Sequence, residues 1–284
     1  MDKKDFRIIT TTNENDTYLP FWPTMAQHWK NFCGFGNVTL GFITERDETD
    51  PLVEEMRQYG EVILIKPIEK IDVGIQSKVS RMYLASERNN ENCIIADIDM
   101  YILNKNYLWD NWFSNVEDGK LLAIGGNSGC YTGNEKGKFP MAFTTAKGSI
   151  WKEIVNPNNL NYEDLLYSWY DLKVFSINES TGNEYGVFSD ESLLRALIGL
   201  WDNYGNVIGY NHPKVKHINR DDWHGCIAIR RIDRIGWKID INKLNGGYFI
   251  DCQPVRPFNQ KLLNPILNYL GISEDKRELK NLKK

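Results

Sequence analysis

Residues Cys93–Leu103 read C-I-I-A-D-I-D-M-Y-I-L, an apolar run that contains two aspartates, Asp97 and Asp99. A β-strand places residues i and i+2 on the same face, about 7 Å apart. The pattern therefore predicts two carboxylates on one side of a strand end. Such charges repel each other, and a buried carboxylate without a partner is strongly destabilising. A hard divalent cation with oxygen ligands, shared with a phosphate-bearing substrate, would relieve both effects.

The residues before this stretch alternate between strand-like and helix-like patterns. The predicted strands are Phe6–Thr12, Val38–Thr44, Glu61–Lys66 and Cys93–Ile98, and the predicted helices are Trp22–Phe32, Pro51–Gln58 and Ile75–Arg88. This βαβ rhythm predicts an α/β fold with a mostly parallel central sheet flanked by helices. Ligands of such sheets gather outside the carboxyl ends of the strands, which is where the two aspartates are expected.

The second half of the chain is less regular. It contains two predicted strands, Leu121–Gly125 and Pro140–Thr145, and a loop-rich segment, Tyr210–Trp223. The predicted helices are Tyr162–Trp169, Ser189–Asn203 and Phe258–Leu270. Ser189 is the expected N-cap of its helix, with Asp190 and Glu191 in the first turn. Because the sequence contains neither an internal repeat nor a low-complexity linker, we expect a single domain over residues 1–284.

Composition excludes several classes of protein. The net charge of −4 gives no broad basic surface for nucleic acid. The five cysteines are odd in number and lack a C-x-x-C pair, which argues against a disulfide framework or zinc site and favours a reducing compartment. We expect a soluble, cytoplasmic protein, because the sequence has neither a signal-peptide pattern nor an apolar run long enough for a membrane span.

Several enzyme classes place a D-x-D motif at a strand end, and the residue that follows helps to separate them. Haloacid-dehalogenase-like phosphatases have Thr or Val two places after the second aspartate, at the end of their first strand. This chain has Tyr101 there, and its motif follows the fourth predicted strand. Both differences count against a phosphatase.

Taken together, the ordered elements resemble nucleotide-sugar-dependent glycosyltransferases of the GT-A fold, of the soluble bacterial or virus-encoded type. The opening strand R-I-I-T-T-T, Arg7–Thr12, is similar to the strand whose end contacts the nucleoside in that family. Lys78 and Arg81 match the basic residues that the family often places on the helix before the D-x-D strand. The segment I-I-A-D-I-D, which ends at Asp99, completes the resemblance.

The resemblance implies a metal-dependent hexosyl- or pentosyltransferase that moves a monosaccharide from a nucleotide sugar, expected to be UDP-linked, to a glycan acceptor. Residues 1–103 would bind the nucleotide, and residues 104–284 would bind the acceptor and supply a C-terminal helix. The implied nucleotide contacts are Thr10, Thr11, Thr12, Lys78, Arg81, Asp97 and Ile98. Mn²⁺ or Mg²⁺ would be held by Asp97, Asp99 and His224, with His217 and His212 as rivals for the histidine position.

Asp190 is the candidate catalytic base, with Glu191 next. An inverting glycosyltransferase needs a carboxylate to take the proton of the acceptor hydroxyl, and the segment V-F-S-D-E-S-L-L-R-A-L resembles the acidic pair that the family places at a late helix. Acidic residues also stabilise the first turn of any helix. Gly126, Asn127, Thr144 and Thr145 are candidate sugar contacts, although turn chemistry explains them equally well.

Two other functions remain open from the sequence. A sugar nucleotidyltransferase also uses a Rossmann-like half and metal-binding aspartates, but it normally has a glycine-rich loop after the first strand. The segment Thr10–Asn13 contains no glycine. A non-catalytic carbohydrate-binding protein would be consistent with the nine Trp and fourteen Tyr residues, which core packing would also explain.

Overall fold

The computed structural model describes residues 2–124, 139–172, 189–203, 212–218, 223–224 and 227–282. The chain forms two compact units, and each is assembled from segments that are distant in the sequence. The first unit consists of Met1–Lys66, Ala96–Ser114 and Ala228–Lys284. The second consists of Pro67–Ile95 and Asn115–Ile227. The chain passes from the second unit to the first between Ile95 and Ala96, immediately before the two aspartates.

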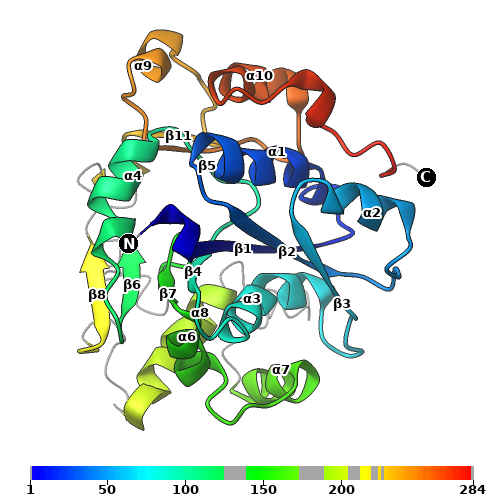
Figure 1. Ribbon diagram of the computed structural model, residues 1–284, viewed down its shortest axis with the longest axis vertical. Coiled ribbons are helices and arrows are strands. Elements are labelled where there is room, and N and C mark those ends of the chain that lie inside the picture. Colours follow the sequence, from blue (N-terminus) through cyan, green and yellow to red (C-terminus); the bar gives the residue numbers. More distant parts are fainter. Residues whose placement is uncertain are drawn as a thin grey trace. The chain divides into compact units, whose positions relative to one another are not determined.

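The first unit is built on three parallel strands in the order β3-β2-β1. These strands are β1 Phe6–Asn13, β2 Asn37–Ile43 and β3 Glu61–Ile65. The helices α1 Trp22–Gln27 and α2 Pro51–Arg57 connect them (Figure 1). Asp50 caps α2, because its side chain accepts a hydrogen bond from the Leu52 amide at 2.8 Å and Pro51 occupies the first helical position.

A small second sheet completes the first unit. It has the strand order β11-β12-β5, in which β12 is parallel to β11 and antiparallel to β5. Its strands are β5 Tyr101–Ile102, β11 Arg231–Asp233 and β12 Asp251–Gln253. The remaining helices of this unit are α4 Lys105–Asn111, α9 Ile241–Asn245 and α10 Gln260–Tyr269. Residues immediately after the two aspartates therefore enter a different sheet from β1.

The second unit contains a four-stranded arrangement in the order β4-β7-β6-β8. Strand β7 is antiparallel to both of its neighbours, whereas β6 and β8 are parallel. The strands are β4 Asn92–Ile95, β6 Leu121–Ile124, β7 Thr145–Lys147 and β8 Val215–Ile218. The α-helices among its described residues are α3 Val73–Ser86, α6 Gly148–Val155, α7 Tyr162–Asp171 and α8 Ser189–Leu200. Helices α3, α6 and α8 pack against one another.

Two short strands, β9 Trp223–His224 and β10 Ile227–Ala228, form a separate pair. The predicted fold class, α/β with a mostly parallel sheet flanked by helices, is confirmed. The strand and helix predictions for residues 6–88 are confirmed to within a few residues at each end. The helix predicted from Trp22 to Phe32 is α1 followed by a π-helical turn, His28–Phe32.

Two strand predictions need correction. The strand expected over Cys93–Ile98 ends at Ile95. The strand expected over Pro140–Thr145 is instead a turn, followed by β7. In that turn Phe143 has a φ of 66° and the Thr144 amide bonds to the Met141 carbonyl at 3.1 Å, so the chain cannot stay extended.

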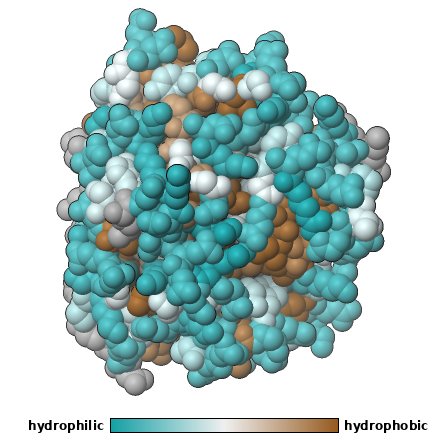
Figure 2. Space-filling model, in the orientation of Figure 1, coloured by the Kyte–Doolittle hydropathy of each residue, from teal (hydrophilic) through white to brown (hydrophobic). Residues whose placement is uncertain are grey.

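The surface drawn in Figure 2 is largely hydrophilic, and its hydrophobic residues gather in smaller areas. Individual exposed apolar side chains, such as Ile235 and Leu200, occur among the described residues, which is normal for globular proteins. Among the helices that the structure describes, none has the length and apolar character needed to cross a lipid bilayer.

Candidate functional site

The two aspartates lie in a turn and not on one strand face. Strand β4 ends at Ile95, and the Met100 amide bonds to the Asp97 carbonyl at 3.3 Å, which closes a turn over residues 97–100. Asp97 is half-buried, whereas Asp99 is buried and only 1% exposed. The expectation that both carboxylates share one face of a strand is therefore wrong, because the chain leaves the extended conformation as it passes toward β5.

The cation beside Asp99 is a guanidinium. Arg256 Nε donates to Asp99 Oδ2, and Arg234 Nη1 lies 4.0 Å from the same oxygen. Burial raises the pKa of the Asp99 carboxyl, and the nearby Arg256 charge opposes that shift while Asp97 adds to it. The buried Asp99 carboxylate therefore has a positive partner, and in this structure an arginine supplies the charge.

Arg256 is itself held in place by its neighbours. Its Nη1 donates to the Tyr18 hydroxyl at 2.7 Å, and its guanidinium stacks on the Tyr18 ring with 4.7 Å to the ring centroid. With its amide oriented to suit both partners, the Gln253 oxygen accepts from Arg256 Nη2 at 3.2 Å and from Arg234 Nη1 at 3.1 Å. We call Tyr18, Asp97, Asp99, Arg234, Gln253 and Arg256 the arginine–aspartate cluster; all six belong to the first unit.

The end of β1 lies next to this cluster. The Ala96 amide bonds to the Ile9 carbonyl at 2.9 Å. Thr10 directly follows Ile9, and Asp97 directly follows Ala96. Thr10 and Thr12 are buried, and Thr11 is half-buried. The Thr10 hydroxyl is enclosed and makes no hydrogen bond to any residue in the described part of the chain. Of the predicted residues, the structure therefore brings the backbone of Thr10 and that of Asp97 near each other, whereas Thr11 and Thr12 continue along β1.

A second ion pair joins two of the other predicted residues. Arg81 on α3 and Asp190 at the start of α8 approach within 2.5 Å, between Nη2 and Oδ2. Their side chains are only 8% and 9% exposed. The sequence had suggested Arg81 for the nucleotide and Asp190 for the acceptor hydroxyl, and the structure pairs them with each other inside the second unit. Removing one member of such a pair leaves a buried charge without its partner.

The remaining predicted residues have varied surroundings. Lys78 is half-buried on α3, and Ile98 is buried with the apolar core. Glu191 is half-buried, and its carbonyl accepts a hydrogen bond from the Phe139 amide at 3.2 Å. His224 ends β9, but its side chain is outside the described part of the structure. Gly126 and Asn127 also lie outside the described residues.

The two rival histidines and the two threonines have structural surroundings. His212 is buried and stacks on the Trp201 ring at 4.6 Å, and its Nδ1 accepts from the Lys214 amide at 3.2 Å. His217 packs against the Phe139 ring. The buried hydroxyls of Thr144 and Thr145 donate to the Pro140 and Phe143 carbonyls. These bonds support turn chemistry for the threonines, the alternative that the sequence had left open.

The chemistry of Asp97 and Asp99 suits a magnesium or manganese ion. Mg²⁺ is usually bound by one or two carboxylates together with waters and substrate phosphates, and not by a complete cage of protein ligands. Within the described ranges, no group of three or more His, Cys, Asp or Glu side chains is arranged to hold a metal. Asp97 and Asp99 would be the protein's share of such a site.

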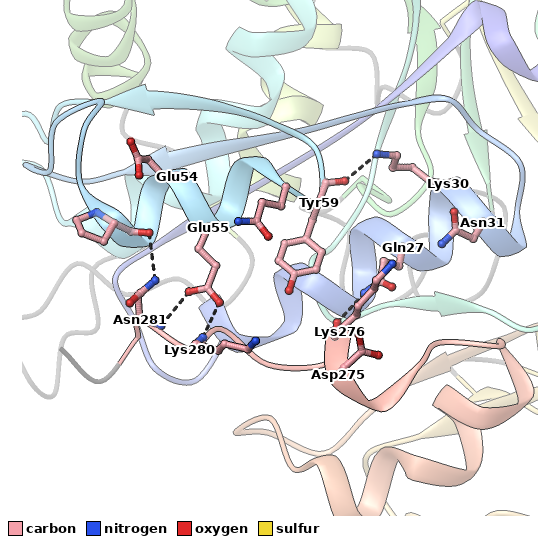
Figure 3. Close-up of a pocket in the computed structure, with 12 residues that line it drawn as sticks. Gln27, Lys30, Asn31, Glu54, Glu55, Tyr59, Asp275, Lys276, Lys280 and Asn281 are labelled. Carbon is pink, nitrogen blue, oxygen red and sulfur yellow. Dashed lines mark hydrogen bonds between the residues drawn. The ribbon is translucent and has the colours of Figure 1, made fainter.

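A separate polar cleft of about 660 Å³ lies between α1, α2 and the C-terminal segment of the first unit (Figure 3). Glu55 accepts hydrogen bonds from the Lys280 and Asn281 amides at 2.7 and 2.8 Å, and the Gln27 amide donates to the Lys276 carbonyl at 2.6 Å. None of the predicted site residues lines this cleft. Its contacts anchor the C-terminal segment to α1 and α2.

Sequence reasoning missed Tyr18, Arg234, Gln253 and Arg256. The arginines stand in R-R-I-D-R and Q-P-V-R-P, where neither strand periodicity nor a known spacing marks them. The cluster became visible only when β12 and the residues after it were placed beside the turn at Asp99. The sole signal in the sequence was the need of a buried carboxylate for a positive partner.

No family model and no curated protein sequence matches the chain. Among solved structures, the galactosyltransferase LgtC in complex with donor and acceptor sugar analogues is similar at 12% identity, with a TM-score of 0.48. That similarity covers 95% of this chain and 99% of LgtC. The glycosyltransferase GlyE of Streptococcus pneumoniae is similar at 14% identity and a TM-score of 0.46, over 93% of this chain and 60% of GlyE.

The same comparison also finds a putative glucose-1-phosphate thymidylyltransferase from Bacillus anthracis, at 10% identity and a TM-score of 0.37, over 77% of this chain and 88% of that protein. These neighbours include both a transferase of sugars and a transferase of nucleotides to sugars. At such identities and scores the similarities do not choose between the two activities. The function proposed below therefore rests on the chain's own residues.

Proposed function

We propose that this protein is a GT-A-type glycosyltransferase that moves a monosaccharide from a nucleotide sugar, expected to be UDP-linked, to a glycan acceptor. The observation that carries the proposal is the position of the arginine–aspartate cluster. Asp97 follows Ala96, whose amide bonds to the Ile9 carbonyl beside Thr10. A carboxylate pair, two guanidinium groups and an enclosed hydroxyl thus occur where α/β folds of this kind bind their ligands.

The charges of this cluster suit a diphosphate leaving group. Departure of a nucleoside diphosphate creates negative charge that must be neutralised. Mn²⁺ or Mg²⁺ held by Asp97 and Asp99 would act there as a Lewis acid on the phosphate oxygens. Arg234 and Arg256 are 37% and 25% exposed at their side chains, and guanidinium groups pair well with phosphate oxygens.

In the second unit, Lys78 and Arg81 are proposed to add positive charge for the nucleotide, and His224 to be a further metal ligand. An inverting reaction requires a base, and Asp190 remains our first candidate, followed by Glu191. The ion pair with Arg81 also gives Asp190 a structural role. The two roles of Asp190 predict different effects when the residue is substituted. A base affects turnover with little change in donor affinity, whereas a structural residue affects the free energy of unfolding.

The proposal is tested by a donor screen. The change in melting temperature is measured for UDP-, GDP-, CMP- and dTDP-sugars, each with and without Mn²⁺, because a ligand that binds the native state raises the melting temperature. We expect one nucleotide sugar to stabilise the protein in the presence of Mn²⁺ and to be hydrolysed slowly without acceptor. The absence of both effects with every donor would overturn the proposal.

The screen separates the alternative functions when pyrophosphate or free glycans are added to it. A sugar nucleotidyltransferase would instead release nucleoside triphosphate from a nucleotide sugar and pyrophosphate. A carbohydrate-binding protein would be stabilised by free glycans and would turn over no donor. The Asp110→Asn variant is a matched control for later site variants, because Asp110 is an exposed residue on α4 in the same unit as the cluster.

A further inference from the structure

Arg256 pairs with one of the two carboxylate oxygens that Asp99 could offer to a metal ion. Its Nε donates to Asp99 Oδ2, and the Asp99 side chain is only 2% exposed. Arg256 is also fixed from its other side by Tyr18, through a 2.7 Å hydrogen bond and ring stacking. The Arg256 guanidinium is therefore held by partners on two sides, unlike the flexible side chains of a surface ion pair.

A second guanidinium increases the positive charge at this point. Arg234 Nη1 lies 4.0 Å from Asp99 Oδ2, and Gln253 bridges Arg234 to Arg256 through one oxygen. A divalent cation that approached Asp99 alone would be repelled by both guanidinium groups at short range. Asp99 thus already has two guanidinium groups within 4.0 Å of its Oδ2 atom before any metal arrives.

A bound diphosphate would offset the repulsion between the metal and the two guanidinium groups. It carries enough negative charge to attract the metal and both guanidinium groups at once, and arginine pairs well with phosphate oxygens. If Arg256 transfers from Asp99 to a phosphate oxygen, Asp99 becomes available to the metal. The phosphate then compensates the charge of Arg256, and the metal compensates the charge of Asp99.

We infer that Arg256 is the internal cation of Asp99 in the unliganded protein, and that a divalent metal binds Asp99 only together with a diphosphate that takes Arg256 and Arg234 as its own ligands. This inference deepens the proposed function and rests on it for the identity of the diphosphate. It makes Arg256 a diphosphate-binding residue that couples metal binding to nucleotide binding. Coupling of this kind is reciprocal, so each ligand must raise the affinity for the other.

The test measures the affinity for Mn²⁺ alone, and then with UDP, by electron paramagnetic resonance of free Mn²⁺. For the unmodified protein we expect weak Mn²⁺ binding that UDP strengthens at least tenfold. Arg256→Gln should bind Mn²⁺ alone at least tenfold more tightly than the unmodified protein and lose most of the strengthening by UDP. Arg234→Gln should show the same changes to a smaller extent.

Two further variants are controls for the loss of a positive charge and for the loss of the Arg256 side chain. Arg230→Gln removes the same charge from the same segment, and since Arg230 contacts Tyr248 and Tyr107 instead of Asp99, its Mn²⁺ affinity should be unchanged. Arg256→Lys retains the positive charge and should keep weak Mn²⁺ binding. The inference is overturned if Arg256→Gln binds Mn²⁺ no more tightly than the unmodified protein, or if Arg256→Lys gains as much as Arg256→Gln.

Failure of the proposed function is distinguishable from failure of this inference. The Mn²⁺ titration without nucleotide reports only on the competition between Arg256 and the metal for Asp99. A chain that lacks glycosyltransferase activity would turn over no nucleotide sugar, yet Arg256→Gln would still show the tenfold gain. Conversely, a glycosyltransferase in which Arg256 does not compete with the metal would be active without that gain.

Discussion

The two units of this protein each contain a buried arginine–aspartate pair, and the pairs differ in their surroundings. Arg81 and Asp190 are both nearly inaccessible, at 8% and 9% side-chain exposure. In the other pair Asp99 is equally enclosed at 2%, but Arg256 is 25% exposed and has Arg234 and Asp97 as neighbours. The first pair is closed to solvent on both sides, whereas the second can be reached from the arginine side.

This difference separates a pair that is closed to solvent in the unliganded protein from a pair that is open to a ligand. In the unliganded protein the closed pair compensates both of its charges and holds α3 against α8. A pair that is open at its arginine can trade that partner for a ligand, provided the ligand brings charge of the appropriate sign. The predictions below test this distinction.

The largest effect is expected from Asp99→Ala. The variant removes the carboxylate on which both the arginines and the proposed metal depend. We expect Mn²⁺-stimulated binding of the donor to weaken by about 100-fold or more, which corresponds to about 2.7 kcal/mol. Isothermal calorimetry with the donor found in the screen measures this change, and Asp110→Asn is the control. Unchanged binding by Asp99→Ala would reject the metal-site assignment.

Arg81→Ala should lower stability more than it lowers donor affinity. The substitution leaves Asp190 buried without its partner, and such losses cost about 3–5 kcal/mol of the free energy of unfolding. Urea denaturation measures it. A double variant, Arg81→Met with Asp190→Leu, should recover most of the loss, because two apolar side chains replace two buried charges. A loss below about 1 kcal/mol for Arg81→Ala would show that the pair is not closed as described.

His28 extends the comparison to a buried titratable group that is kept neutral instead of being paired with an opposite charge. Burial lowers its pKa to about 3 from an ordinary value of 6.5, and its Nε2 accepts from the Ile102 amide at 2.9 Å. As the pH falls below 6.5 the unfolded chain binds a proton that the folded protein refuses, so stability is lost down to about pH 3.

Between pH 7 and pH 5 the contribution of His28 amounts to about 2 kcal/mol of destabilisation. Urea denaturation at the two pH values measures it, and His28→Gln should show a smaller pH dependence over the same interval even though it is less stable at pH 7. An equal pH dependence in the two proteins would mean that other groups cause the acid sensitivity.

The smallest effect is expected at an exposed ion pair. Lys120 and Glu117 lie 2.7 Å apart with side chains 41% and 42% exposed, and Lys216 also contacts Glu117. Lys120→Ala should leave the urea midpoint at pH 7 within experimental error of that of the unmodified protein, because solvent screens the pair and Lys216 remains.

Hydrogen bonds from the two lysines lower the pKa of Glu117 to about 2. Any stabilisation by these contacts is thus present above the ordinary pKa of Glu117 and is lost as the pH falls toward 2.

The elements of residues 6–88 could be predicted because their signals are local. Short strand-like runs indicated β1 to β3, and apolar residues at helical spacing indicated α3. Asp50 and Asp72 cap their helices with short side-chain bonds to amides two and three residues later. Such signals act over one or two turns of chain, and the structure retains them.

The end of β4 could not be predicted from the same rules. Apolar residues precede Asp97, separate it from Asp99 and resume at Met100, so the pattern suggests an extended strand. The strand stops at Ile95 because the next residues form a turn that leads to β5, which pairs with β12 from the C-terminal part of the chain. A pairing across that distance leaves no trace in the local pattern.

The sequence by itself determined that a hydrophobic stretch carries two carboxylates and that at least one of them requires positive charge. The tertiary structure alone decided which groups meet that requirement. Arg256 reaches Asp99 across 157 positions of sequence, and Arg81 reaches Asp190 across 109. The physical reason is that burial makes compensation of charge obligatory, whereas the choice of partner depends on which distant segments the fold brings within hydrogen-bonding distance.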